Sequence, residues 1–184
     1  MSSLLENGRT HDCGALRHAD VGASVVLFGW VHRRRDHGAL IFINLRDRFG
    51  ITQVVIDPDL APAAHAAAAE LRGEFCVGVA GVVVSRGDNI NPQMPTGEIE
   101  VSLRALEVFS SADPLPFNVA DDAELDATEG HRLKYRYLDL RRPSLQKNFV
   151  LRSRLATLTR LSLAEAGFLE LETPFMVKYT PGGA

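Results

Sequence analysis

Cysteine is scarce in this sequence of 184 residues: only Cys13 and Cys76 occur, far apart and without a CxxC pair. Two separated thiols make neither a disulfide framework nor a zinc-binding set, so we expect reduced thiols and no metal site. The sequence also lacks an apolar run of the length that a signal peptide or a membrane span needs. These absences predict a cytoplasmic protein that has no membrane partner.

An excess of positive charge is missing as well, because the formal net charge is -3. This value excludes a uniformly basic nucleic-acid binder but allows a local basic face on an acidic body. The apolar fraction of 46% is that of an ordinary globular protein. The length allows one medium domain, or a small domain and part of a second.

The first part of the chain is mostly β. Apolar, β-branched segments are separated by turn signals, and an alanine-rich segment with a proline near its start interrupts them. Three strands, a helix and two further strands are the order of an OB-fold, a five-stranded Greek-key barrel that binds oligonucleotides. A generic α+β sandwich is the alternative and matches the order less well. The predicted strands are Val25–His32, Ala39–Arg46, Ile51–Ile56, Cys76–Ser85 and Ile99–Phe109, with the helix at Ala61–Leu71.

The second predicted strand alternates strictly between two faces. One face is mixed and consists of Leu40, Phe42, Asn44 and Arg46. The other face is aliphatic and consists of Ile41, Ile43 and Leu45. On the mixed face the ring of Phe42 is available for stacking on a nucleic-acid base. If the two faces are reversed, Phe42 belongs to the core instead.

Arginines gather at the end of the first strand, where Arg33, Arg34 and Arg35 are consecutive. Arg46 and Arg48 follow nearby, opposed by Asp36 and Asp47. Such a run is usually a solvated face, so by itself it does not indicate binding.

The third strand adds Gln53, whose amide offers a donor and an acceptor to a base edge. A cation, a ring and an amide on adjacent strands together indicate recognition of single-stranded RNA.

The second part of the chain changes character. Residues 113–130 contain six acids and neither lysine nor arginine, which is typical of a linker, whereas 131–142 carry five basic residues and one acid. A long helix is expected from an N-cap at Ser144 to Gly167, with a stripe of Leu151, Leu155, Leu158 and Leu161, followed by a strand at Phe168–Glu172.

The predicted domains are an OB-fold domain (1–112), an acidic hinge (113–134) and the beginning of an α+β domain (135–184). One helix and one strand cannot close a hydrophobic core. We therefore expect either a fragment or a segment that packs on another chain.

Four segments resemble bacterial-type aspartyl-tRNA synthetases. GWVHRRRDHGALIFINLRDRFGITQVV (29–55) and TGEIEV (96–101) resemble the anticodon-binding domain of that family. YRYLDLRR (135–142) resembles the opening of the catalytic domain in the aspartyl, asparaginyl and lysyl enzymes, and GFLELETP (167–174) is similar to motif 1 of class II synthetases. The resemblance covers nearly the whole chain in the right order, and the form RRRDxGxLIFI favours the aspartyl enzymes.

The resemblance implies roles for single residues. Phe42 would stack on the central anticodon base, which Arg35 and Gln53 would contact. Glu100 and the loop around Asn89 would contact a neighbouring nucleotide. Arg33 and Arg34 are expected to bind RNA beside them. Pro174 would lie at the interface of a homodimer.

Two positions bear on specificity. The family usually has a glutamate that holds the ammonium group of the amino acid, but Gly182 stands there and has no carboxylate. His37 resembles enzymes that charge both tRNA-Asp and tRNA-Asn, whereas Asn89 resembles the discriminating type. These two signals conflict, and we hypothesise relaxed specificity, the alternative being that His37 is a loop residue without consequence.

The reaction implied is ligation of L-aspartate to tRNA-Asp through aspartyl-adenylate, with ATP and Mg²⁺. No candidate for class II motif 2 or motif 3 precedes Ala184. We therefore expect no catalytic residue, no bound ATP or Mg²⁺ and no aminoacylation in this chain. The alternatives are a stand-alone OB-fold RNA-binding module with a dimerising tail and a structural domain without an RNA role.

Overall fold

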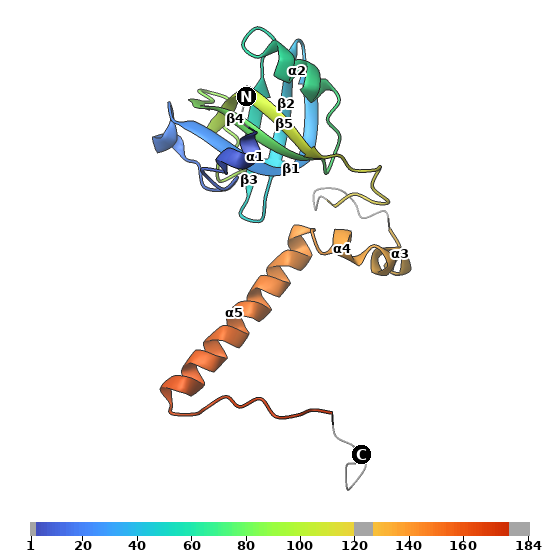
Figure 1. Ribbon diagram of the computed structural model, residues 1–184. Helices are drawn as coiled ribbons and strands as arrows, with labels where there is room; N and C mark the ends of the chain where they lie inside the picture. The colour runs from blue at the N-terminus through green and yellow to red at the C-terminus, as the bar shows by residue number, and fades with distance from the viewer. Residues whose placement is uncertain (1–2, 120–126, 177–184) are drawn as a thin grey trace. The chain divides into compact units, whose positions relative to one another are not determined.

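The computed structural model describes residues 3–119 and 127–176, which fall into two compact units, 1–115 and 116–184. Figure 1 shows the strands of the first unit wrapped into a barrel and the helices of the second. The predicted Gly182 lies outside the described residues. No helix in the described ranges has the length and apolar character to span a membrane.

The first unit is a closed five-stranded barrel with the strand order β1-β2-β3-β5-β4. All neighbours are antiparallel except β3 and β5, which are parallel. This arrangement confirms the predicted OB-fold. Its elements are α1 Leu4–Asn7, a 3-10 turn at His18–Asp20, β1 Ser24–His37, β2 Leu40–Arg46, β3 Ile51–Ile56, α2 Pro62–Ala69, β4 Cys76–Ser85 and β5 Ile99–Ser110.

The barrel core follows from strand alternation. Ile43 and Leu45 of β2 are fully buried, and they pack with Val54 of β3 and Val79 of β4 in one aliphatic cluster. Phe42 lies on the opposite, outer face of β2 and is only half-buried. The predicted face assignment is therefore confirmed, and the reading of Phe42 as a core residue is wrong.

Strand β1 differs from the prediction because it continues past His32 to His37. Its pairing with β2 shifts between Val31 and Arg33, where His32 is the extra residue of a β-bulge. Beyond the bulge Arg33 pairs with Asn44. The three arginines therefore lie within the strand, and the long β1 curls with the barrel wall.

The second unit contains α3 Glu129–Lys134, α4 Arg136–Asp139 and α5 Pro143–Glu165. Helix α3 lies inside the range expected to be a linker. The Asp139 carboxylate is fully buried, and Arg132, Arg136 and Arg142 approach it at 3.6, 2.5 and 3.6 Å. This ion cluster joins α3, α4 and the start of α5.

Helix α5 corrects two predictions. Its N-cap is Arg142 rather than Ser144, because Pro143 occupies the first turn, where its missing N–H costs nothing. At the other end Gly167 has a φ of 88° and closes the helix as predicted. No strand forms at 168–172, because the described part of the chain pairs no second strand with this segment.

Candidate nucleic-acid interface

A hollow of about 430 Å³ lies on the outside of the barrel. Strands β1, β2, β3 and β5 and the loop after β4 contribute its walls. It brings together six of the residues predicted from the sequence, with two others. The lining residues are Arg35, Asp36, His37, Phe42, Gln53, Arg86, Asn89 and Glu100.

Strand register explains why the ring and the cation meet. Arg35 of β1 is the direct partner of Phe42 of β2, so both side chains leave the same face. On the next strand Gln53 pairs with Asn44, two residues from Phe42. The ring is therefore flanked by a guanidinium on one side and an amide on the other.

A chain of polar contacts fixes the amide of Gln53, which is only 4% exposed. Arg35 Nη2 donates to Gln53 Oε1 at 3.1 Å, and Gln53 Nε2 donates to Glu100 Oε2 at 2.7 Å. Arg86 Nε lies 3.9 Å from the same carboxylate oxygen. Because each end of the amide has a partner of defined polarity, its orientation is set before any ligand arrives.

Two of the predicted arginines lie elsewhere. Arg34 donates to the Ala69 carbonyl at 2.7 Å and to Asp36 at 2.8 Å. Arg33 lies on the outer face of β1 but does not line the hollow. Arg33 thus shares a face of β1 with Arg35, whereas Arg34, the partner of the buried Ile43, lies on the other face and is held against α2.

The basic patch is smaller than the sequence suggested. Arg46 Nη2 donates to both carboxylate oxygens of Glu74, at 2.7 and 2.9 Å. Arg48 lies over the ring of Phe49, with its guanidinium carbon 5.6 Å from the ring centroid. Arg46 therefore stabilises the barrel, and Arg48 packs on the turn after β2. The cations that line the hollow are Arg35 and Arg86.

Sequence reasoning missed Arg86 and gave Asp36 only the role of an opposing charge. Arg86 directly follows β4 and is the only basic residue of the loop 86–98, which was the available signal. Its side chain is 13% exposed, and Nη1 is buried without a hydrogen-bond partner among the described residues. A guanidinium held in this way can donate to a base edge or a phosphate.

The hollow can bind a flat, polar ring. Phe42 offers a stacking face, and the Gln53 amide keeps one N–H and one lone pair beyond the contacts above. Two arginines balance the carboxylates of Asp36 and Glu100, so the hollow is polar without a strong net charge. This balance suits recognition of a base more than simple attraction of phosphate.

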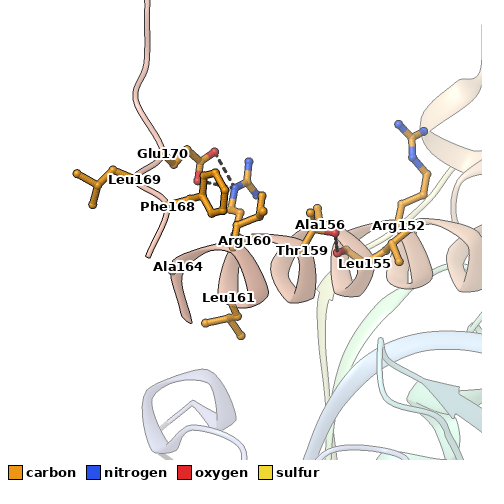
Figure 2. A pocket seen from close by; sticks show the side chains of 11 residues that line it. Arg152, Leu155, Ala156, Thr159, Arg160, Leu161, Ala164, Phe168, Leu169 and Glu170 are labelled. Atoms are coloured by element: carbon orange, nitrogen blue, oxygen red, sulfur yellow. Dashed lines mark hydrogen bonds and ion pairs between the residues drawn. The ribbon is translucent and has the colours of Figure 1, made fainter. Parts of the chain in front are cut away.

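A larger hollow of about 800 Å³ lies along α5 and the segment after it and contains none of the predicted site residues. Figure 2 shows Phe168 and Leu169 beyond the end of the helix and the ion pair of Arg160 with Glu170, 2.9 Å apart. The walls are mostly apolar, and the Arg160 and Glu170 side chains among them are paired with each other. Pro174 lies in an exposed, irregular segment beyond it.

Comparison with known proteins gives a separate family match for each of the two compact units. Residues 25–109 match the family described as OB-fold nucleic acid binding domain, and residues 128–184 match tRNA synthetases class II (D, K and N). An aspartate–tRNA(Asp/Asn) ligase of Anaeromyxobacter dehalogenans is 57% identical over 98% of this chain. A ligase of the same name from Geotalea uraniireducens is 53% identical over 96%.

Solved structures give the same relationship. Asparaginyl-tRNA synthetase from Pyrococcus horikoshii, complexed with asparaginyl-adenylate, aligns over 94% of this chain and 38% of its own, with a TM-score of 0.81 and 27% identity. The chain spans about 30% of the length of the curated relatives named above. The two family matches follow one another along the chain, and the alignments to these relatives cover 98% and 96% of it. The chain therefore belongs to the class II tRNA synthetases of the aspartyl, lysyl and asparaginyl type, and within them resembles the aspartate–tRNA ligases.

Proposed function

We propose that the barrel reads the anticodon of tRNA-Asp on behalf of an aspartate–tRNA ligase. The observation that carries this proposal is the placement of the Phe42 ring between Arg35 and the fixed amide of Gln53. Stacking on such a ring contributes about 1–3 kcal/mol per base. The relatives named as aspartate–tRNA(Asp/Asn) ligases agree with this assignment.

Each residue of the hollow has a distinct task. Phe42 stacks on the central base of the anticodon, and Arg35 and Gln53 bond to the edge of that base. Glu100, with Asn89 in the loop after β4, contacts the neighbouring nucleotide. Outside the hollow, Arg33 binds the RNA backbone, and Arg34, held by Ala69 and Asp36, supports the end of β1 rather than the RNA.

The complete ligase joins L-aspartate to the tRNA in an ATP-dependent reaction through aspartyl-adenylate. In the described residues no group of three or more histidine, cysteine or carboxylate side chains could hold a metal ion. The described residues therefore offer no such ligand set for Mg²⁺. The chain contributes recognition of the tRNA and is expected not to aminoacylate.

A second copy of the ligase is the partner proposed for α5. Leu155 and Leu158 are each 63% exposed on this helix, which buries none of its residues within the chain. Pro174 belongs to the segment that follows and would lie in the same interface. A symmetric homodimer is the commonest way to cover such a face.

The test of anticodon reading compares two phenylalanines. An RNA hairpin that carries the anticodon GUC should bind the Phe42→Ala variant about 5- to 150-fold more weakly than the parent chain, because stacking is lost. Phe49→Ala is the matched control, since Phe49 is 58% exposed and outside the hollow. Fluorescence anisotropy measures both, and equal affinity of the two variants would contradict the proposal.

Relaxed tRNA choice is the second part of the proposal, because His37 lines the hollow and the relatives are named aspartate–tRNA(Asp/Asn) ligases, whereas Asn89, which also lines it, is the opposing signal. Hairpins with GUC and GUU, the anticodons for aspartate and asparagine, should bind with affinities that differ by less than about threefold, or about 0.7 kcal/mol. Competition between labelled and unlabelled hairpins gives this ratio. A preference for GUC above about thirtyfold would show that this part of the proposal is wrong.

A further inference from the structure

We infer that a buried ion pair outside the hollow, Arg46 with Glu74, positions the RNA-reading arginines by holding the bulge of β1. This inference rests on the proposed function, because it assigns a task to residues that support Arg35. Neither Arg46 nor Glu74 lines the hollow. They act, in this account, as positioning residues.

The bulge decides which way the arginines point. Side chains alternate along a strand, so one extra residue moves every later side chain to the other face. With His32 as the extra residue, Arg33 and Arg35 pair with Asn44 and Phe42 on the outer face of β2. Without it they would follow Val31 toward the barrel interior, and the hollow would lose its cation.

The backbone before β4 makes two hydrogen bonds to Val31, the residue that precedes the bulge. Val31 N donates to the Phe75 carbonyl at 2.9 Å, and Glu74 N donates to the Val31 carbonyl at 2.8 Å. Glu74 has a φ of 64°, and it is the one residue other than glycine with positive φ among those described. A side chain at such a position is disfavoured unless its surroundings hold it there.

The side chain of Arg46 supplies that hold. Nη2 donates to both carboxylate oxygens of Glu74, and Nη1 donates to Nδ1 of His32 at 3.0 Å. Because arginine has no acceptor, His32 must accept through Nδ1 in this contact. The guanidinium of Arg46 therefore ties β2 to the bulged residue and to the turn before β4.

Burial makes this tie firm. The side chains of Arg46 and Glu74 are 11% and 4% exposed, so water competes little for their charges. Phe42 and Gln53 lie on β2 and β3 and do not depend on the bulge of β1 for their direction. Loss of the ion pair should thus weaken the contact made by Arg35 more than stacking on Phe42.

The experiment is a double-mutant cycle on the full chain with the GUC hairpin. Glu74→Ala removes the carboxylate but leaves a side chain at the positive φ, so nothing then holds the disfavoured backbone conformation. We expect it to weaken binding about tenfold in the parent chain and less than twofold in the Arg35→Ala background. Asp59→Ala, at an exposed loop position, is the matched control and should change neither value.

His32→Ala is the second variant, because it removes the contact at the bulge and leaves Glu74 in place. It should give the same pattern, and it carries the test if circular dichroism shows that Glu74→Ala no longer folds. Equal weakening in both backgrounds, or unchanged affinity in both, would overturn the inference. Failure of the parent chain to bind the hairpin would instead refute the proposed function first, so the two failures are distinguishable.

Discussion

At the scale of single residues, Cys13 shows how the barrel controls a reactive group. Its thiol is fully buried, with Sγ 3.6 Å from the Phe28 carbonyl, and its backbone N–H donates to Asp47 at 2.8 Å. Burial raises the pKa of the Cys13 thiol far above its ordinary value of 9.0, and the Asp47 carboxylate adds to this effect. Since thiolate is the nucleophile, Cys13 should be inert in the folded chain.

Alkylation tests this directly. Iodoacetamide at pH 8 should leave Cys13 unmodified in the native chain and modify it in guanidinium chloride, as read by mass spectrometry of the Cys13 peptide. Native labelling as fast as in denaturant would contradict this prediction.

The buried thiol should also make stability depend on pH. Above about pH 9.0 the thiol of the unfolded chain ionises while the buried thiol stays neutral. The free energy of unfolding should therefore decrease as pH rises above that value.

The residues of the hollow were predictable to different degrees. Alternation along 39–46 placed Phe42 on the outer face, because burial in a strand has a period of two. The bond between Arg35 and Gln53 could not be predicted, since it depends on the bulge and on register across three strands. Arg86 was missed because its one signal, a single arginine in a polar loop, is equally typical of a solvated side chain.

At the scale of elements, strands with partners were predicted well and the segment after α5 was not. The bounds of β3 and β4 match the predicted ranges, and β1 extends further because its bulge lets it follow the barrel wall. The alternation at 168–172 is a real pattern, but a strand forms only when a second strand accepts its hydrogen bonds. That partner depends on residues distant in sequence or on another chain.

The exposed leucines of helix α5 lead to a prediction about self-association. If a second copy covers its leucines, the chain should self-associate at micromolar concentration. Replacing both Leu155 and Leu158 with glutamate should then shift it toward monomer, because charges in an apolar interface remain unpaired. Sedimentation equilibrium measures the effect, and Leu133→Glu, on an exposed leucine of α3, is the control. A parent chain that is already monomeric at these concentrations would contradict the proposed homodimer.

At the scale of the whole molecule, the net charge and the two compact units determine which part of the chain should bind RNA. A chain with a net charge of -3 gains little from general attraction to phosphate, so its affinity for RNA should come from the hollow. All the residues that line the hollow belong to the first compact unit, 1–115. The match to the class II synthetase family, residues 128–184, lies in the second unit.

The central claim is that the hollow reads the middle base of the anticodon. The most direct test measures the affinity of the full chain for the GUC hairpin and for hairpins in which only the central U is replaced by A, C or G. The account predicts binding at least about tenfold weaker for every replacement, because the contacts of Arg35 and Gln53 to the base edge are lost. Equal affinity for all four hairpins would contradict it.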